Sequence, residues 1–447
     1  MSKYQTKVVK FGGTSLASAE QIQKAVAIIR AEDARRYVVP SAPGKRFDGD
    51  KKVTDMLIAL YEASEQGNPC EELLGEIEQR YTEIVGDLGL SLDLSPEFAA
   101  IRAQLAAGTT LDYLASRGEY LNGLILAGYL GYPFIDAAKV IFFDENGAFE
   151  AELTNRVLSR RLSRQRNAVI PGFYGSLPNG TIKTFSRGGS DITGAIVARA
   201  ANADLYENWT DVSGFLMTDP RIVPNPKAIK IITYRELREL SYMGAAVLHE
   251  DSIFPVKVAG IPINIKNTNR PDDNGTLIVP SKDGFEPMAS PAPGAITGVA
   301  GRKGLCLIHI EKDMMNQEIG FGAKVLQTIA EMGISFEHLP SGIDTMSVVI
   351  SRADLEGKEE ELIRRITAAV QPDFISLEGE LALVAVVGRG MMGTPGSAAR
   401  VFGALAKEKI NIRMIDQGSS ELNIIVGVNE KDFERAVGAI YAEFTAS

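Results

Sequence analysis

The feature that most constrains this chain is its N-terminal segment, residues 7–15, which reads Lys-Val-Val-Lys-Phe-Gly-Gly-Thr-Ser. An apolar pair leads into two glycines and two hydroxyl residues, and apolar residues then recur at helical spacing from Ile22. This pattern predicts a strand, a glycine turn and the start of a helix. Glycines let backbone N–H groups approach an anion, and a helix N-terminus adds partial positive charge. With Lys10 ending the strand, the segment predicts a phosphate-binding turn; a tight connection alone is the alternative.

Length and charge narrow the class of protein. A chain of 447 residues predicts two or three domains. The net charge of −10 argues against a surface for nucleic acid or anionic membranes. The two cysteines, Cys70 and Cys306, form no metal or redox motif and fit a reducing compartment. The N-terminus has no signal-like apolar core, and no apolar run is long enough to cross a bilayer. We therefore expect a cytoplasmic protein.

Short apolar runs alternate with helical patterns through about the first 270 residues. This alternation predicts a parallel, doubly wound sheet between two layers of helices, a three-layer αβα domain. In such sheets ligands bind at the carboxyl ends of the strands, where the glycine turns of this chain fall. A proline-containing stretch at 281–293 marks a domain boundary.

The residues after this boundary form an approximate repeat of strands and helices in the order βαββαβ. The first copy spans 305–377, and the second begins at Leu381 and ends one strand short. A spare strand at 296–302 would complete the second copy, so we predict that the first copy is inserted within the second. Gly388-x-Gly390-x-x-Gly393 matches a dinucleotide-binding pattern, but too few residues follow it for that fold.

Three further motifs are candidates for binding. Arg187-Gly-Gly-Ser-Asp191 suits a carboxylate, or it forms a surface ion pair at a helix cap. Glu119 would face a substrate amine, or it would favour a helix N-terminus. Thr210-Asp211 would hold a nucleotide, or it forms an Asx-type turn. The chain shows no nucleophile with an obvious base, and phosphoryl transfer to a carboxylate needs neither.

As a set, the motifs resemble those of aspartate kinases in the amino-acid kinase family. The matching segments are Lys-Phe-Gly-Gly-Thr-Ser at 10–15, Ser-Ala-Pro-Gly at 41–44, Arg-Gly-Glu at 117–119, Ser-Arg-Gly-Gly-Ser-Asp at 186–191, Trp-Thr-Asp-Val-Ser-Gly at 209–214 and Thr-Asp-Pro-Arg at 218–221. The tail resembles the paired ACT domains of that family. The resemblance implies a catalytic domain at 1–285 and two ferredoxin-like ACT domains, the first at 303–378, inserted into a second made of 294–302 and 379–447.

The resemblance also implies an activity. It is the ATP-dependent phosphorylation of the β-carboxylate of L-aspartate to 4-phospho-L-aspartate, the first step towards lysine, threonine and methionine. Magnesium would be bound by the ATP phosphates, and the protein itself would form no metal site. The ACT domains would bind an amino-acid effector and join the chain into a homodimer or homotetramer. The identity of the effector stays open: it is lysine, threonine, both or neither.

The same resemblance assigns residues by motif. The predicted catalytic residues are Lys10, Arg187 and Asp191. Aspartate would contact Ser41, Thr54, Glu119, Phe173, Arg187, Ser190 and Asp191, with Arg187 on the α-carboxylate and Glu119 and Asp191 on the ammonium side. ATP would contact Lys10, Gly12, Gly13, Thr14, Thr210, Asp211, Asp219 and Arg221. The effector would contact Met315, Gly320, Phe321, Gly322, Ser341 and Asp344.

Two departures from the family pattern stand out. Ala246 precedes Val-Leu-His where a nucleotide-side lysine is common, so Arg221 or Lys227 is the alternative cation. The basic loop 45–52 is longer than usual, and its side chains could serve near the phosphates.

Two other functions compete: a kinase of this fold acting on glutamate, acetylglutamate or UMP, and a non-catalytic amino-acid sensor. The motif set argues against the other kinases, and the presence of all four charged residues, Lys10, Glu119, Arg187 and Asp191, argues against a non-catalytic sensor.

Replacing Arg187 with lysine tests its assignment to the α-carboxylate. Lysine keeps the charge but loses the bidentate fork, so Arg187→Lys is expected to raise the KM for aspartate about tenfold or more and to leave the KM for ATP nearly unchanged. Steady-state kinetics with each substrate varied in turn measure both constants. An equal rise in both would contradict the assignment.

Overall fold

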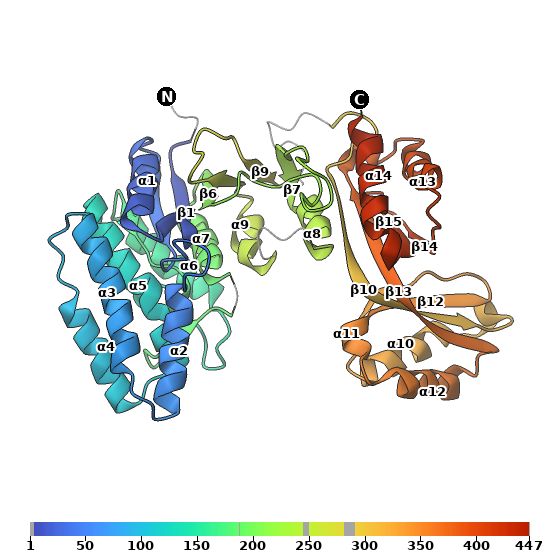
Figure 1. The fold of residues 1–447 in the computed structure, drawn as a ribbon, viewed down its shortest axis with the longest axis horizontal. Coiled ribbons are helices and arrows are strands. Elements are labelled where there is room, and N and C mark those ends of the chain that lie inside the picture. The colour runs from blue at the N-terminus through green and yellow to red at the C-terminus, as the bar shows by residue number, and fades with distance from the viewer. Residues whose placement is uncertain (1–3, 187, 245–249, 281–290, 447) are drawn as a thin grey trace. The chain divides into compact units, whose positions relative to one another are not determined.

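The computed structural model describes residues 4–186, 188–244, 250–280 and 291–446 (Figure 1). The chain forms two compact units. The first comprises Met1–Phe215, Ile229–Tyr234 and Val247–Phe285, and the second comprises Leu216–Ala228, Arg235–Ala246 and Glu286–Ser447. Within the described ranges, no helix combines the length and apolar character needed to cross a membrane.

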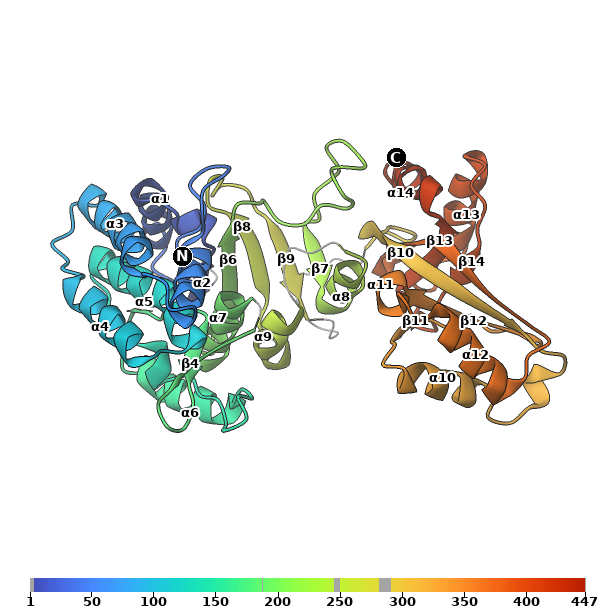
Figure 2. The same ribbon diagram turned by 60° about the horizontal axis from the view of Figure 1, so that its bottom comes forward.

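A seven-stranded sheet forms the centre of the first unit. Its strands are β1 (Lys7–Phe11), β2 (Arg35–Pro40), β3 (Ala168–Val169), β6 (Leu205–Thr210), β7 (Ile231–Thr233), β8 (Ile263–Asn267) and β9 (Thr276–Val279), in the order β3-β2-β1-β6-β8-β9-β7. Figure 2 shows β6, β8, β9 and β7 side by side. Every neighbouring pair is parallel except β8 and β9. The predicted α/β fold is confirmed, but the expectation of a wholly parallel sheet was wrong, because β9 runs antiparallel to β8.

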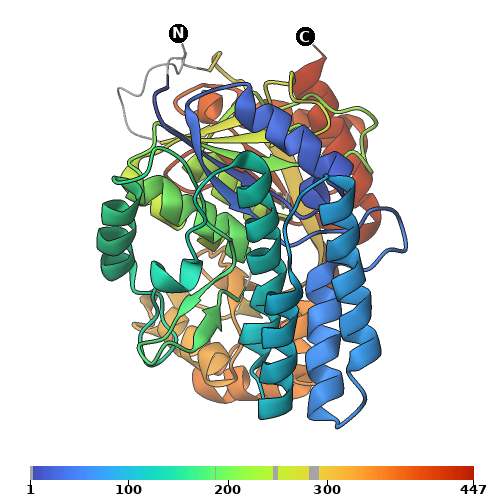
Figure 3. The ribbon, with the colours of Figure 1, turned by 90° about the vertical axis from the view of Figure 1, so that its left-hand side faces the viewer.

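Helices cover the two faces of this sheet. One core joins Val9 and Phe11 of β1 to α1 (Ala19–Arg30), α2 (Val53–Glu65), α3 (Glu71–Asp87), α4 (Ser95–Ala107) and α5 (Leu111–Leu130), which Figure 3 shows largely side by side. Side chains alternate along a strand, so Lys10 of β1 faces the other side. There it meets α7 (Gly189–Ala200), through Asp191. The unit also contains α6 (Ala151–Leu162), α9 (Phe254–Ala259) and the hairpin β4 (Tyr174–Ser176) with β5 (Ile182–Thr184).

Helix α5 decides between the two alternatives for Glu119. It starts at Leu111, with the Thr110 hydroxyl accepting a hydrogen bond from the Tyr113 amide. Glu119 therefore lies in the middle of a 20-residue helix, which excludes its alternative role as a helix N-terminal charge. Helix α2 begins at Val53, so Thr54 lies inside its first turn and does not cap it.

Gly118 sets how closely α5 approaches the segment after β2. A Cβ built on Gly118 would lie 2.7 Å from the Ala42 Cβ and 3.4 Å from a Leu57 methyl carbon. No side chain fits at that distance without moving a neighbour. Gly128, on the same helix, has nothing within 4 Å of such a Cβ. The two glycines thus differ in packing although they share a helix.

The second unit contains a six-stranded antiparallel sheet. Its strands are β10 (Gly298–Glu311), β11 (Phe336–His338), β12 (Thr345–Ser351), β13 (Phe374–Val387), β14 (Met414–Asp416) and β15 (Asn423–Asn429), in the order β11-β12-β10-β13-β15-β14. Its helices are α8 (Tyr234–Tyr242, which starts in the first unit), α10 (Phe321–Glu331), α11 (Arg352–Leu355), α12 (Glu359–Val370), α13 (Ser397–Lys407) and α14 (Phe433–Thr445). One core lies beside α10 and α12, and a second lies beside α13 and α14.

Strand β10 runs through both halves of this sheet. Residues 298–302 pair with 383–387, and residues 381–387 pair in turn with 423–429. Residues 305–311 pair with β12 and with the start of β13, after an irregularity at Arg302–Leu305. The two strands expected at 296–302 and 305–310 are therefore one bent strand. The sequence missed their continuity because Lys303-Gly304 looked like a break.

The glycine pattern at 388–393 has a packing explanation. A Cβ on Gly388 would lie 2.6 Å from the Ile296 Cα, and one on Gly390 would lie 2.5 Å from the Ala295 carbonyl oxygen. These glycines let the turn after β13 lie against the chain that enters β10. This contact accounts for both glycines without a dinucleotide.

Two segments that precede residue 285 belong to the second unit. Glu236 of α8 is fully buried and receives hydrogen bonds from the Thr297 hydroxyl and from Arg389, whose guanidinium pairs with it at 3.1 Å. The Tyr441 hydroxyl of α14 accepts a bond from the Lys227 amide. A boundary placed only by the prolines could not anticipate these segments, since long-range contacts define their membership.

The two glycines of α5 give a paired stability test. Gly118→Ala is expected to lower the free energy of unfolding by about 1–3 kcal/mol, because the methyl group overpacks the contact with Ala42. Gly128→Ala is expected to be neutral or to stabilise by up to about 1 kcal/mol, since alanine favours a helix and meets no atom. Chemical denaturation of both variants measures the difference. Equal effects would contradict the packing role of Gly118.

Candidate active site

The centre of the site is an ion pair between two segments far apart in sequence. The Lys10 Nζ lies 2.6 Å from the Asp191 Oδ1. Lys10 is at the carboxyl end of β1, and Asp191 is at the N-terminus of α7. Asn208 of β6 donates to the same carboxylate oxygen at 2.7 Å. Lys10 is only 7% exposed, so its charge is largely desolvated and needs a partner. Lys10 and Asp191, which the sequence predicts for one site, are therefore in contact, and Asn208 joins them without any sequence signal.

The glycine turn packs against the end of β2. A Cβ on Gly44 would lie 2.5 Å from the Gly13 carbonyl carbon, and the Gly44 amide donates to the Gly13 oxygen at 2.8 Å. A Cβ on Gly12 would lie 3.7 Å from the Lys10 Nζ and 4.0 Å from the Thr210 hydroxyl. The structure thus brings the glycines, Lys10 and Thr210 together. Thr14 follows as the exposed first residue of a short 3-10 turn, Thr14–Leu16.

Glu119 points from α5 towards the start of α7. Its Oε1 accepts from the Ser190 hydroxyl at 3.4 Å, and its Oε2 is buried with no hydrogen-bond partner in the described part of the chain. Burial raises the pKa of the Glu119 carboxyl to about 7, although the Ala42 amide, the Ser190 hydroxyl and the Lys10 charge favour the ionised form. A buried carboxyl with one oxygen unpaired is a binding group for a cationic donor.

Ser41 lies beside this group. Its amide donates to the Phe11 oxygen at 3.1 Å, and its carbonyl accepts from the Asn122 side chain at 2.7 Å. Asn122 stands three residues after Glu119 on the same helix, so α5 holds both the carboxyl and the segment after β2. Thr54 lies in the first turn of α2, next to Val53, whose amide bonds to the Pro43 oxygen.

Phe173 has a backbone conformation that a bulky residue rarely adopts. Its φ is +80°, and its amide donates to the Thr193 hydroxyl at 3.0 Å. A Cβ on Gly189 would lie 2.4 Å from the Phe173 ring, and one on Gly172 would lie 2.6 Å from the Ser190 hydroxyl. The two glycine turns therefore interlock and set Ser190 beside Phe173. Arg187 lies outside the described residues.

The remaining edge of the site is formed by the ends of β6 and β8. Thr210 and the exposed Asp211 end β6, with the Thr210 hydroxyl donating to the Asp211 carboxylate at 3.2 Å. Thr268 follows β8; its amide bonds to the Thr210 oxygen, and its hydroxyl lies 2.7 Å from that of Ser15. Thr268 is a site-edge residue that sequence reasoning missed, because no local motif marks it.

Asp219 and Arg221 belong to the second unit, where they pair with each other at 2.6 Å. The Arg221 partner lowers the pKa of the Asp219 carboxyl. Their assignment to ATP stays a prediction. Ala246, the position of the unusual family departure, lies outside the described residues.

The carboxylate of Asp50 connects the basic loop 45–52 to helix α3. Arg46 and Arg80 pair with Asp50 at 2.9 and 3.1 Å, and their hydrogen bonds and charges hold its pKa well below the usual range. Arg80 is buried and donates to the Gly44 oxygen at 2.6 Å. The loop therefore braces the glycine turn, and Arg46 already has a carboxylate partner. Arg80 carried no sequence signal, because it lies within an ordinary amphipathic helix.

The predicted effector residues lie together in the second unit. The turn holding Met315, before α10, faces the segment 341–344 through a bond from the Asn316 amide to the Ile343 oxygen at 3.1 Å. The Met314 amide also donates to the Asp344 carboxylate at 2.9 Å. Gly320 has φ +84° at the helix cap, and a Cβ on Gly322 would lie 3.8 Å from the Met346 methyl carbon. Phe321 is buried in the α10 core and Ser341 is exposed.

A strand-end site with a lysine, a glycine turn and the carboxylates of Asp191 and Glu119 is typical of proteins that bind phosphates. The family model of the amino acid kinase family matches residues 5–267, and that of an ACT domain matches residues 384–444. The chain belongs to the amino acid kinase family.

Its relatives within this family are aspartokinases. The chain is 39% identical to aspartokinase 3 of Bacillus subtilis, over 98% of this chain and 99% of the relative. It resembles the crystal structure of Clostridium acetobutylicum aspartate kinase with a TM-score of 0.90 and 51% identity, covering 99% and 100% of the two chains. E. coli aspartokinase III in complex with aspartate and ADP matches with a TM-score of 0.71 and 26% identity, covering 98% and 99%. The same E. coli enzyme with lysine and aspartate matches with a TM-score of 0.71 and 28% identity, covering 99% and 100%. The resemblance to aspartate kinases is confirmed.

Proposed function

We propose that this chain catalyses the ATP-dependent phosphorylation of the β-carboxylate of L-aspartate. The observation that carries the proposal is the meeting of Lys10, Asp191, Glu119 and Ser190 at one strand-end edge, in a chain that aligns over its whole length with aspartokinases. A related structure binds aspartate and ADP.

The residues act by position and charge. The acceptor carboxylate is already an anion near pH 7, so no general base is needed. Lys10 neutralises the phosphoryl group in transfer, and the glycine turn supplies backbone donors around the phosphates. Lys10 pairs with Asp191, and Asn208 keeps that carboxylate in place. The ammonium of aspartate would pair with the free Glu119 oxygen and lie beside the Asp191 carboxylate. Arg187 would bind the α-carboxylate.

Magnesium belongs to the nucleotide in this proposal. In the described part of the chain, no group of three or more His, Cys, Asp or Glu side chains is placed to hold a metal ion. Magnesium is commonly bound by one or two carboxylates together with substrate phosphates, which fits a site whose anionic ligand brings the oxygens. Bound there, it would shield the phosphate charge.

Regulation and assembly are proposed for the second unit. We assign residues 303–378 to a first ferredoxin-like ACT domain inserted into a second, formed by 294–302 and 379–447; the pairing of 298–302 with 383–387 supports this division. An amino-acid effector would bind at the turn of Met315–Gly322, and E. coli aspartokinase III offers a parallel because it has been crystallised with lysine. Dimers or tetramers would form through the ACT domains, and we expect the enzyme to work in the cytoplasm.

Removing the Lys10 charge tests the catalytic assignment. Lys10→Ala is expected to reduce kcat about a hundredfold or more, since one preorganised charge is lost from the transferring phosphoryl group. Lys24→Ala, at a partly exposed position of α1, is the matched control and is expected to keep full activity. A coupled assay of ADP release, with aspartate and glutamate offered separately, measures both rate and acceptor. Near-normal turnover of the Lys10 variant would contradict the proposal.

The raised pKa of Glu119 predicts a pH dependence of aspartate binding. Glu119 is ionised above its pKa of about 7 and protonated below it, and only the ionised form pairs with an ammonium. The KM for aspartate is therefore expected to fall as pH rises from about 6 to about 8. Glu119→Gln should raise this KM about tenfold or more and remove the dependence, while Glu145→Gln on an exposed turn should change neither. A pH profile unaltered in Glu119→Gln would overturn the assignment.

A further inference from the structure

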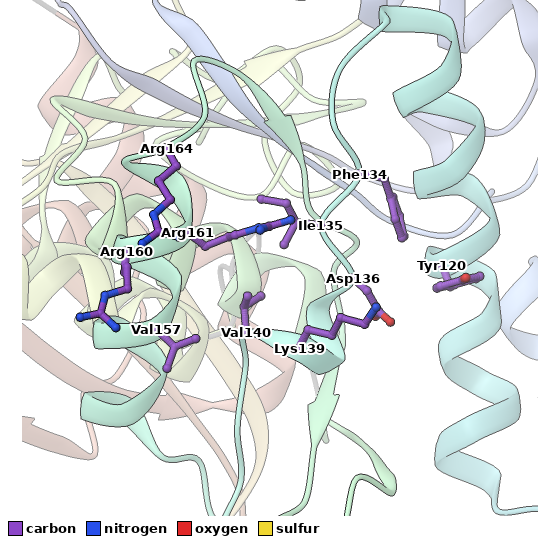
Figure 4. A pocket seen from close by; sticks show the side chains of 10 residues that line it. All are labelled: Tyr120, Phe134, Ile135, Asp136, Lys139, Val140, Val157, Arg160, Arg161 and Arg164. Carbon is purple, nitrogen blue, oxygen red and sulfur yellow. The ribbon is translucent and has the colours of Figure 1, made fainter.

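The first unit contains a second concave site, away from the residues assigned to aspartate and ATP. It is a pocket of about 460 Å³, which falls in the size range of small-molecule sites. Figure 4 shows its lining, which consists of Tyr120, Phe134, Ile135, Asp136, Lys139, Val140, Val157, Arg160, Arg161 and Arg164. None of these residues has a role in the proposed reaction.

Positive charge gathers in this pocket. Four of the lining side chains are cations: Lys139, at the end of the turn Ala137–Lys139, and three arginines from the end of α6 and just beyond it. None of the four forms an ion pair with any carboxylate of the described chain. Other arginines of the unit differ in this respect: Arg35, Arg46, Arg80 and Arg199 each pair with a carboxylate, whereas Arg156 and Arg166 pair with none in the described chain. In a protein of net charge −10, such a local excess of cations favours an anion.

The single acid of the pocket does not balance these charges. Asp136 Oδ1 accepts hydrogen bonds from the Ala138 amide at 3.1 Å and from the Tyr174 hydroxyl at 2.8 Å. It thereby fixes the turn that carries Lys139 and is held within the protein wall. With one carboxylate against four cations, the lining has an excess of three positive charges.

The helix dipole explains only part of the cluster. Arg160 and Arg161 lie in the last turn of α6, where cations complement the partial negative charge of the helix end. Arg164 follows the helix, and Lys139 comes from a different segment, so the dipole of α6 gives no reason for either. Their convergence on one cavity is the observation that points to a ligand.

An apolar wall completes the pocket. The rings of Tyr120 and Phe134 pack edge to face with centroids 5.4 Å apart, and Val140 and Val157 line the same cavity. Arginine forks match carboxylate and phosphate oxygens bidentately, which a ligand with more than one anionic group would exploit. The apolar wall leaves space for the carbon part of such a molecule.

We propose that this pocket is a binding site for a small polyanion, a molecule that carries at least two phosphate or carboxylate groups and fits within about 460 Å³. The site belongs to the first unit and shares no residue with the predicted effector turn at Met315–Gly322. The proposal does not depend on the identity of the phosphoryl acceptor.

The test is calorimetric titration of the full-length protein, free of nucleotide and magnesium, with pyrophosphate and with citrate as separate probes. The Arg160→Gln/Arg164→Gln double variant is expected to bind at least tenfold more weakly than the unsubstituted protein. The matched control is Arg156→Gln/Arg166→Gln, which removes the same charge from exposed positions of the same region outside the pocket. It is expected to bind nearly as well as the unsubstituted protein. Tighter binding of one probe would tell phosphate from carboxylate ligands.

A third protein separates this pocket from the active site. Lys10→Ala should keep the binding that Arg160→Gln/Arg164→Gln loses, because Lys10 does not line the pocket. Any pyrophosphate binding that is lost only in Lys10→Ala belongs to the phosphate-binding turn of the active site. The proposal is overturned if neither probe saturates the protein below about 5 mM, if both double variants weaken binding equally, or if Lys10→Ala alone abolishes it. Unfolding curves and kinase rates for the two double variants check that the exposed substitutions leave the fold intact.

Discussion

The contact between Gly13 and Gly44 is the constraint on which the rest of the site depends. Two backbone segments, one after β1 and one after β2, touch at a distance that admits no Cβ on Gly44. Arg80 then bonds the Gly44 oxygen, and Gly118 lets α5 lie against Ala42. These contacts fix the strand ends relative to α5. Lys10 and Glu119 consequently project from two rigid elements instead of from free loops, which preorganises the charges.

The electrostatics of the site follow from burial. A desolvated ammonium at Lys10 is tolerated because Asp191 lies 2.6 Å away and Asn208 orders that carboxylate. Glu119 has hydrogen bonds but only a distant cation, so burial dominates and its pKa rises to about 7. The site therefore holds one compensated ion pair and one carboxyl with a pKa of about 7. A ligand bearing both an ammonium and anionic groups suits that distribution of charge.

The second unit shows a different organisation, in which two hydrophobic cores share one sheet. Strands β10 and β13 each extend through both halves, so the same two strands join the cores, although their pairing is irregular at Arg302–Leu305. Residues 216–228 and 235–246 also belong to this unit, although they flank β7 of the first sheet in sequence. The chain thus passes between the units several times. This covalent continuity gives effector binding a physical connection to the catalytic unit.

The sequence by itself determined the elements and the motifs, because those depend on local patterns. The apolar residues predicted the strand that begins at Lys7, and the glycine turns marked the strand ends at Lys10 and Thr210 and the start of the helix that carries Asp191. Motif resemblance supplied the family and the activity. Neither depends on how distant segments pack.

Only the tertiary structure decided which distant groups meet. Asn208 and Thr268 joined the site because parallel strands bring their carboxyl ends together, and neither residue belongs to a recognisable motif. Arg80 became a brace for the glycine turn, and Glu236 an anchor of the second unit, through contacts across long stretches of chain. The four cations beside Tyr120 were unremarkable in the sequence, since their common feature is one cavity. Local pattern records propensity, whereas burial, pairing and pKa depend on neighbours that folding alone supplies.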